Sequence, residues 1–214
     1  MINILLVDDH QMIRQGLRLL LSEQPDMTVV GEAKNGREAL EMVVSKSPSV
    51  VVMDLNMPEL NGIDATRQVV AARKGIKVIC LSAHANQKMA ADALSAGAEG
   101  YVLKESAFEE LVTAIRTVMG NKVYLSPSIA GMVVGDLLRL KEGFPAGPSN
   151  GLSSREREIL QLISEGRTTK QIAYGLHISV KTVETHRRNM MEKLNIDNVA
   201  ELTKYAVREG LTSL

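Results

Sequence analysis

Two short, fully apolar runs that each end in carboxylates constrain this chain more than any other feature. The run Ile4–Val7 is followed by Asp8 and Asp9, and the run Val50–Met53 is followed by Asp54. Such runs are typical of strands buried on both faces of a parallel sheet. Carboxylates gathered at one sheet edge repel each other strongly unless a cation joins them. The sequence therefore predicts an acidic, cation-binding site at the end of a buried sheet.

Residues 1–120 alternate between strand-like and helix-like patterns. Segments with the spacing of amphipathic helices separate the short β-rich runs, so that five strands alternate with five helices. This order predicts an α/β fold with a doubly wound, five-stranded parallel sheet of the flavodoxin-like kind. The expected strands are Asn3–Val7, Met27–Glu32, Val50–Asp54, Lys77–Ser82 and Gly100–Lys104.

The carboxyl ends of these strands carry the residues with the most chemistry. Ligands in open α/β sheets bind beyond this edge, where Asp8, Asp9, Asp54, Ser82 and Lys104 would all lie. Each residue alone has a plainer explanation, because an aspartate after a strand often caps a helix, a serine often forms a turn and a lysine is often solvated. Their occurrence together at one edge favours a functional site.

The residue types at this edge suit phosphoryl chemistry. Mg²⁺ prefers a few hard carboxylate and carbonyl oxygens and keeps several waters. A carboxylate such as Asp54 can attack phosphorus and form an aspartyl phosphate. The transferring group carries negative charge, which Lys104 can neutralise and to which Ser82 can donate a hydrogen bond.

The rest of the chain divides into a linker and a helical region. Residues 126–140 are expected to form a helix, and the 11 residues after them contain three glycines and two prolines, which is typical of a linker. Residues 152–214 lack a strand pattern, and Ser153 with Glu156 predicts a capping box that opens the first of four helices. The expected divisions are therefore 1–120, a linker helix and flexible linker over 121–151, and an all-α domain over 152–214.

Composition excludes several classes of protein. The chain has a formal net charge of zero, but residues 151–214 carry 10 lysines and arginines against 8 acids, a net of +2 that weakly favours an anionic partner. No apolar stretch approaches the ~18 residues of a membrane span, and the first residues lack the features of an export signal. With one cysteine, Cys80, a disulfide framework is excluded. We expect a cytoplasmic protein without a membrane partner.

Residues 1–120 resemble the receiver domain of bacterial two-component response regulators. The motifs that carry the resemblance are Val7-Asp8-Asp9-His10, Met53-Asp54-Leu55-Asn56-Met57-Pro58 with Gly62, Leu81-Ser82-Ala83 and Tyr101-Val102-Leu103-Lys104. One departure is Glu105, which stands where many relatives have proline.

The resemblance implies a role for each matching residue. Asp54 would be the phospho-acceptor, with a sensor histidine kinase as the donor. Asp9 would bind Mg²⁺ directly, Asp8 mainly through water, and the main-chain carbonyl of Asn56 would complete the protein's share of the metal shell. The residues expected to hold or sense the phosphoryl group are Ser82, Lys104 and Tyr101, although Tyr101 can also be read as an ordinary amphipathic residue at the sheet edge.

Residues 152–214 resemble a LuxR-type helix-turn-helix domain, and the two resemblances together indicate the NarL/FixJ class of response regulators. The matching segments are Leu152–Leu160, Lys170-Gln171-Ile172-Ala173, Ile178–His186 and Lys193-Leu194. Many relatives carry lysine where this chain has Glu184. An acid near phosphates lowers general affinity, so this departure favours base selection.

The expected DNA-reading helix runs from Val180 to Leu194. Helical spacing places Val183, the stem of Arg187, Met190 and Leu194 toward the core. Glu184, Thr185, Arg188 and Met191 would then face outward, toward a major groove. The expected DNA contacts are Thr169, Lys170, Lys181, Thr182, Glu184, Thr185, Arg187, Arg188 and Lys193, of which Arg188 and Glu184 are candidates for reading bases.

The function expected from these features is phosphorylation-dependent, DNA-binding regulation of transcription. The chain would catalyse only its own phosphorylation and dephosphorylation. The partners would be promoter DNA and, on activation, a second copy that pairs through the last helix, with Val199, Leu202, Tyr205, Ala206 and Val207; RNA polymerase is a further candidate. Two alternatives are a regulator that acts without phosphorylation and a Mg²⁺-dependent phosphatase. Asn56 argues against the phosphatase, which needs an acid at that position.

Overall fold

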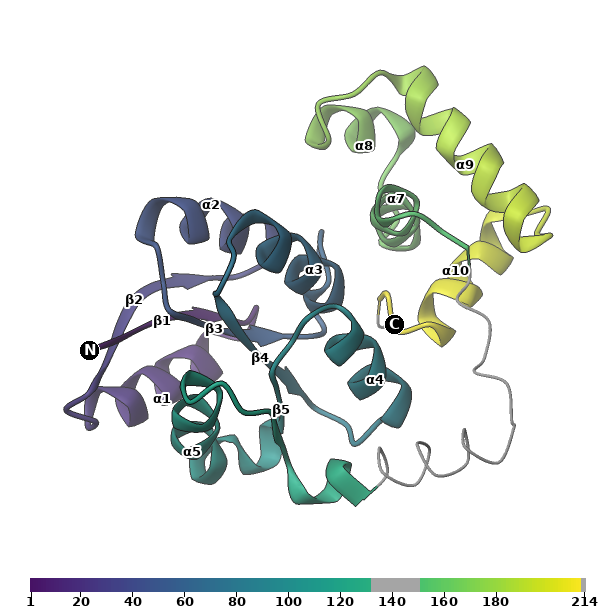
Figure 1. Cartoon of the computed structure of the whole chain (residues 1–214). Helices are drawn as coiled ribbons and strands as arrows, with labels where there is room; N and C mark the ends of the chain where they lie inside the picture. The colour runs from purple at the N-terminus through teal and green to yellow at the C-terminus, as the bar shows by residue number, and fades with distance from the viewer. Residues whose placement is uncertain (132–150, 213–214) are drawn as a thin grey trace. The chain divides into compact units, whose positions relative to one another are not determined.

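The computed structural model describes residues 1–131 and 151–212, and the chain divides into two compact units. The first unit is a parallel sheet with helices on both faces, and the second is a group of helices (Figure 1). The expected fold class is therefore confirmed.

The sheet of the first unit has the strand order β2-β1-β3-β4-β5-β6, and every neighbouring pair is parallel. The strands are β1 (Ile2–Val7), β2 (Met27–Ala33), β3 (Val50–Asp54), β4 (Lys77–Ser82), β5 (Gly100–Leu103) and β6 (Tyr124–Leu125). The sixth strand extends the five that the sequence predicts. It has only two residues, too few to show the alternation by which strands are found.

Helices cover both faces of this sheet. They are α1 (Gln11–Ser22), α2 (Gly36–Lys46), α3 (Gly62–Ala72), α4 (Gln87–Ser95), the 3-10 turn η1 (Lys104–Ser106) and α5 (Ala107–Met119). On one face, apolar residues of α1 and α5 pack against alternate residues of the strands, such as Ile4, Leu6 and Val52. On the other face lie α2, α3 and α4, which contact the strands and whose buried residues include Ala39 and Ala90 (Figure 1). Burial on both faces explains the uninterrupted apolar runs.

The described residues of the second unit form four helices, as the sequence predicts. They are α7 (Ser154–Ser164), α8 (Thr169–Gly175), α9 (Val180–Leu194) and α10 (Val199–Arg208). Ser153 and Glu156 form the predicted capping box, and Thr168 with Gln171 forms a second one. A single apolar core joins the helices, with Ile159, Leu160, Ile172, Val183, Met190, Leu202 and Ala206 among its buried members.

The segment between the units is described only at its start. Of the helix expected over 126–140, residues 127–131 are helical, and the remainder of that helix and most of the expected flexible linker lie outside the described residues. The main-chain carbonyl of Ser126 accepts from the N–H groups of Ile129 and Ala130 and so caps this first turn. Among the described residues, no helix is long and apolar enough to cross a membrane.

Candidate functional site

Four adjacent strands bring the predicted acidic site together. Because β1, β3, β4 and β5 are neighbours and parallel, their carboxyl ends lie along one edge (Figure 1). Asp8 and Asp9 directly follow β1, Asp54 ends β3 and Ser82 ends β4. Lys104 is the first residue of η1, one position beyond the strand in which the sequence places it.

Lys104 contacts two buried carboxylates at once. Its Nζ lies 2.7 Å from Asp8 Oδ2 and 2.8 Å from Asp54 Oδ2. Asp8 and Asp54 are only 2% and 1% exposed, so this ion pair is shielded from water. Within the described part of the chain, Lys104 is the only partner found for these two Oδ2 atoms. The side chains predicted to cooperate therefore lie in direct contact.

The cluster remains short of positive charge. Three carboxylates, those of Asp8, Asp9 and Asp54, face one lysine, which leaves a formal charge of −2. Burial and the charge of Asp8 raise the pKa of Asp54 from 3.8 to about 6, although Lys104 acts in the opposite direction. Burial lowers the pKa of Lys104, but the two carboxylates outweigh this and raise it above its usual value. The site thus fits a divalent cation with hard oxygen ligands.

His10 belongs to the same cluster, although no role was predicted from the sequence for this member of the Val7-Asp8-Asp9-His10 motif. Candidate ligand atoms of Asp8, Asp9, His10 and Asp54 all lie within 4.8 Å of one another. His10 Nδ1 lies 2.7 Å from Asp9 Oδ1 and 3.2 Å from Asp8 Oδ1. The only sequence signal was its position immediately after the two aspartates.

The loop after β3 packs closely behind Asp54. A Cβ atom on Gly62 would lie 2.0 Å from the main-chain oxygen of Asp54, so only glycine fits there. Asn56 donates its main-chain N–H to Asp54 Oδ1 at 3.3 Å, and its side chain is exposed. The loop therefore holds the backbone of Asn56 beside the carboxylate and leaves its amide in solvent.

Ser82 and Tyr101 lie on neighbouring strands beside the acidic cluster. Ser82 is buried and donates a hydrogen bond to the main-chain oxygen of His84 at 3.0 Å. Tyr101 is completely buried, and burial raises the pKa of its phenol while the nearby Ser82 hydroxyl lowers it. Within the described part of the chain, the phenol oxygen has no hydrogen bond of good geometry. Ser82 and Tyr101, the two residues that would sense a phosphoryl group, are thus near each other, but no hydrogen bond of good geometry joins their hydroxyl groups.

A hydrogen-bonded cluster behind β5 was not expected from the sequence. Ser126 donates its main-chain N–H to Tyr101 at 2.9 Å, and its hydroxyl accepts from the N–H of Leu103 at 3.2 Å. The same hydroxyl donates to Glu110 on α5, which also accepts from Tyr124 at 3.1 Å. This Ser126 cluster joins β5, β6, α5 and the turn that begins at residue 127. Its serine and glutamate are 16 residues apart and match no motif.

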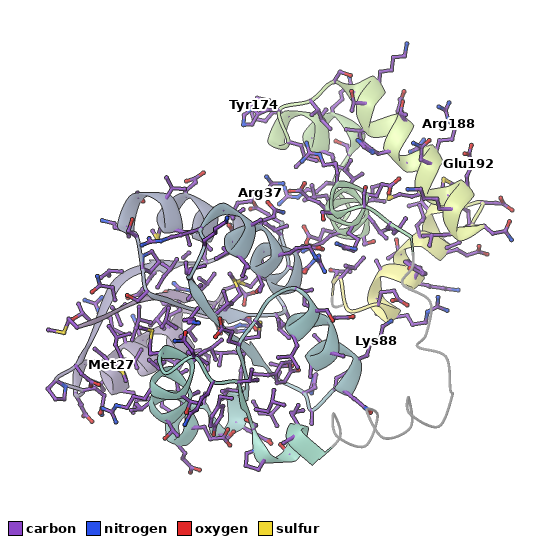
Figure 2. All side chains as sticks on the ribbon, viewed as in Figure 1. Met27, Arg37, Lys88, Tyr174, Arg188 and Glu192 are labelled. Carbon is purple, nitrogen blue, oxygen red and sulfur yellow. The ribbon has the colours of Figure 1, made fainter. Side chains whose placement is uncertain are left out.

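The second unit presents α9 as a polar surface. Val183 and Met190 are buried and Leu194 packs on the core, whereas Glu184, Thr185 and Arg188 are exposed, as predicted for these six residues. Figure 2 shows Arg188 and Glu192 projecting from the outer side of α9; their side chains are 70% exposed and 4.0 Å apart. Of the other expected contacts, Lys170 and Lys181 are exposed and Thr169, Thr182 and Arg187 are partly buried.

Two expectations for this unit need correction. Met191, expected to face outward, is partly buried and packs against the core. The pairing surface expected on α10 is largely used within the unit, because Leu202, Tyr205 and Ala206 are buried in its own core and only Val199 is largely exposed. Helical periodicity shows which residues share a face but not which neighbour covers that face.

Lys193 has a partner inside its own unit. Its Nζ lies 2.9 and 2.8 Å from the two carboxylate oxygens of Glu156, the residue that completes the capping box of α7. Lys193 and Ser153 both hold the carboxylate of Glu156 and keep its pKa below the usual value despite its burial. Lys193 therefore stabilises the junction of α7 and α9.

Comparison with known proteins agrees with this fold. Residues 4–116 match the response regulator receiver domain, and residues 150–206 match the luxR family of bacterial regulatory proteins. The transcriptional regulatory protein LiaR of Bacillus subtilis is 39% identical over 213 residues, which cover 100% of each chain. The response regulator UvrY of Escherichia coli is 37% identical over 211 residues, 99% of this chain and 96% of UvrY.

A solved structure shows the same combination of domains. RcsB from Salmonella enterica serovar Typhimurium, bound to promoter DNA in the presence of the phosphomimetic BeF3⁻, is 26% identical, covers 99% of both chains and has a TM-score of 0.60. Fold, site and comparisons define a receiver followed by a DNA-binding helix-turn-helix domain. The chain belongs to the NarL/FixJ family of two-component response regulators, which are transcription regulators rather than classical enzymes.

Proposed function

We propose that this chain regulates transcription in response to phosphorylation of Asp54 by a sensor histidine kinase. The observation that carries the proposal is that one lysine, Lys104, is shared by the buried carboxylates of Asp54 and Asp8, at 2.8 and 2.7 Å. A structural ion pair needs one carboxylate for one lysine. A second and third carboxylate at the same point raise the free energy of the empty site, which a divalent cation relieves.

The chemistry follows from the positions of these groups. An oxygen of the Asp54 carboxylate forms a bond to phosphorus while the P–N bond of the kinase phosphohistidine breaks, and the electron pair of that bond remains on the imidazole. Lys104 neutralises a phosphoryl oxygen, and Ser82 turns its hydroxyl from His84 to donate to another. Mg²⁺, when bound by Asp8, Asp9, Asp54 and the Asn56 carbonyl, supplies the charge that lets the carboxylates ionise together.

The same site is poorly equipped to act on small substrates. A phosphatase that uses Asp54 as its nucleophile needs a general acid for the leaving group. The side chain of Asn56, two residues after Asp54, is an exposed amide that cannot donate a proton in this way. We therefore assign to the chain only its own phosphorylation and dephosphorylation.

The Ser126 cluster offers a route from the site toward the second unit. Tyr101 and Leu103 of β5 bind Ser126 through their main chains, and Lys104 follows Leu103 directly. A shift of Lys104 toward phosphoryl oxygens would move the end of β5 and therefore the capping residue of the helical turn at 127–131. We propose that phosphorylation acts on the linker, residues 121–151, along this route and shifts an existing equilibrium.

The second unit, residues 152–214, is proposed to bind promoter DNA through α9. The exposed residues Glu184, Thr185 and Arg188 would face base edges in the major groove. The proposed backbone contacts are Thr169, Lys170, Lys181, Thr182 and Arg187, whereas the ion pair with Glu156 leaves Lys193 less available. The modest net charge of +2 predicts weak binding by one copy, so two phosphorylated copies on a two-part site would bind far better. A cytoplasmic location follows from these partners.

The test compares the wild-type chain, Asp54→Asn and the control Asp26→Asn, each with and without acetyl phosphate and Mg²⁺. Asp26 pairs with Arg116 on the surface and lies outside the cluster. Mass spectrometry should show one added phosphoryl group in the wild type and in Asp26→Asn but none in Asp54→Asn. Promoter affinity, measured by fluorescence anisotropy, should rise only in the two phosphorylated proteins. Equal affinity with and without phosphoryl transfer would support the alternative of a regulator that acts without phosphorylation.

A further inference from the structure

The ring of His10 faces the acidic cluster although the residue begins a helix. His10 is the N-cap of α1, but its side chain makes no capping hydrogen bond. Its main-chain N–H instead donates to Asp8 Oδ1 at 2.8 Å, which turns the residue toward the two aspartates. The Nδ1 atom then lies 2.7 Å from Asp9 Oδ1 and 3.2 Å from Asp8 Oδ1.

We propose that His10 Nδ1 is a ligand for divalent transition-metal ions in this site, so that the site binds ions such as Mn²⁺, Ni²⁺ or Zn²⁺ with a nitrogen donor that Mg²⁺ does not use. The proposal rests on the proposed function, because it assumes that the carboxylates of Asp9 and Asp54 hold a divalent cation. It adds a residue to that site and a chemical basis for choosing between ions.

The distances suit two ligands of one ion. Two donor atoms about 2.1 Å from the same ion and at right angles to each other lie about 3.0 Å apart. The separations of 2.7 and 3.2 Å between His10 Nδ1 and the aspartate oxygens bracket this value. All candidate ligand atoms lie within 4.8 Å of one another, close to the roughly 4.2 Å that separates two donors on opposite sides of one ion with bonds of this length.

The chemical type of each ligand atom determines which metal ions bind more tightly. Mg²⁺ prefers oxygen ligands and water, whereas imidazole nitrogen suits Ni²⁺, Zn²⁺ and Cu²⁺. A neutral imidazole adds a ligand without changing the charge of −2 that the three aspartates and Lys104 leave. Replacing His10 should therefore reduce affinity for transition-metal ions much more than affinity for Mg²⁺.

A simple ion pair is the competing explanation. If His10 served only as a cation for Asp8 and Asp9, its contribution would be small, because its side chain is 66% exposed. It would also affect all divalent ions alike, since it would act only through charge. The two explanations thus differ in whether the effect depends on the kind of metal.

The experiment measures binding of Mg²⁺, Mn²⁺ and Ni²⁺ to the untagged full-length chain by isothermal titration calorimetry. His10→Gln keeps the main-chain N–H and a similar size, and His186→Gln on α9 is the matched control. In His10→Gln, affinity for Ni²⁺ should fall at least about tenfold, a loss at least as large as that from removing an outer-shell partner of a ligand, and affinity for Mg²⁺ should stay within about twofold. His186→Gln should bind all three ions as the wild type does.

A spectroscopic measurement identifies the ligand directly. Electron spin echo spectra of the Mn²⁺-loaded wild type should show coupling to an imidazole nitrogen, and those of His10→Gln should lack it. Normal Mg²⁺ binding by the wild type together with equal losses of affinity for all three ions in His10→Gln, or Mn²⁺ spectra that His10→Gln leaves unchanged, would overturn the role of His10 alone. If the wild type bound no divalent ion, or if Asp9→Asn bound all ions normally, the proposed metal site itself would be wrong.

Discussion

Replacing Asp54 by asparagine should stabilise the first unit in the absence of metal. The carboxylate is 1% exposed and faces Asp8, which is also buried, with only Lys104 between them. Burial and Asp8 together raise its pKa from 3.8 to about 6. Asparagine has nearly the same shape as a protonated aspartate and never ionises, so it removes this unfavourable charge.

The sign and size of the effect follow from linkage. Because the pKa of Asp54 is higher in the folded state than in the unfolded chain, the contribution of this group to stability is greatest below pH 3.8 and is lost as the pH rises through about 6. A difference between 3.8 and about 6 corresponds to roughly 3 kcal/mol at neutral pH. The advantage of Asp54→Asn should therefore be at most about 3 kcal/mol near pH 7.5 and about half of that near pH 5.

Differential scanning calorimetry of the full-length chain can follow this unit as a separate transition. Each kcal/mol should move its midpoint by roughly 4 °C, so Asp54→Asn should melt up to about 12 °C higher near pH 7.5 and only about 6 °C higher near pH 5. Saturating Mg²⁺ should reduce the difference between the two melting temperatures, because it binds the folded wild type more tightly than the variant.

The exposed Asp26 provides a control of opposite sign. Its hydrogen bond with Arg116 keeps its pKa below the usual value, so Asp26→Asn should slightly destabilise the unit at neutral pH. A wild type that melts at the same temperature as Asp54→Asn at both pH values would refute the electrostatic reasoning, as would a gap that widens toward low pH.

Three further changes test other parts of the structure. Lys104→Met leaves two buried carboxylates without their cation and should lower the free energy of unfolding, measured in urea, by at least about 3 kcal/mol. Adding Asp54→Asn to this variant should restore a large part of that loss. Purely additive effects of the two substitutions would argue against direct coupling. Ser126→Ala should lower the free energy of unfolding by about 1–3 kcal/mol. It should also reduce the gain in DNA affinity on phosphorylation, although mass spectrometry still shows phosphorylated protein. An unchanged gain in affinity would exclude the Ser126 cluster from signalling. Arg188→Ala should weaken promoter binding by about 1–3 kcal/mol and relax selectivity at one base pair, unlike the exposed control Lys204→Ala.

The position of the acidic site could be predicted from sequence because it depends on topology. Parallel strands end at one edge, so Asp8, Asp54 and Ser82 had to come together once the strands were recognised. The same reasoning fails for residues whose role depends on local turns. Lys104 lies in η1 rather than at the end of β5, and the direction of the His10 ring depends on how α1 is capped.

Contacts between distant side chains were the least predictable part. The bond between Ser126 and Glu110 needs the pairing of β6 with β5, and β6 is too short to show a strand pattern. In the second unit, periodicity correctly predicted that Val183 and Met190 face the core. It could not show that α10 would bury its apolar face in the core of its own unit. Packing partners of an amphipathic helix are a tertiary property that no single segment encodes.

Charge balance connects the acidic site to its proposed output. Without metal the cluster carries −2, and a divalent cation would cancel it, but a phosphoryl group on Asp54 replaces one negative charge by about −1.5 to −2 and leaves a net of about −0.5 to −1. Lys104 cannot then remain within 2.8 Å of both Asp8 and Asp54 and also neutralise the new oxygens. It must redistribute its contacts, and it is joined directly to Leu103, whose N–H binds Ser126. The deficit of positive charge that makes Asp54 costly to ionise is thus the same feature that would make Lys104 respond when Asp54 is modified.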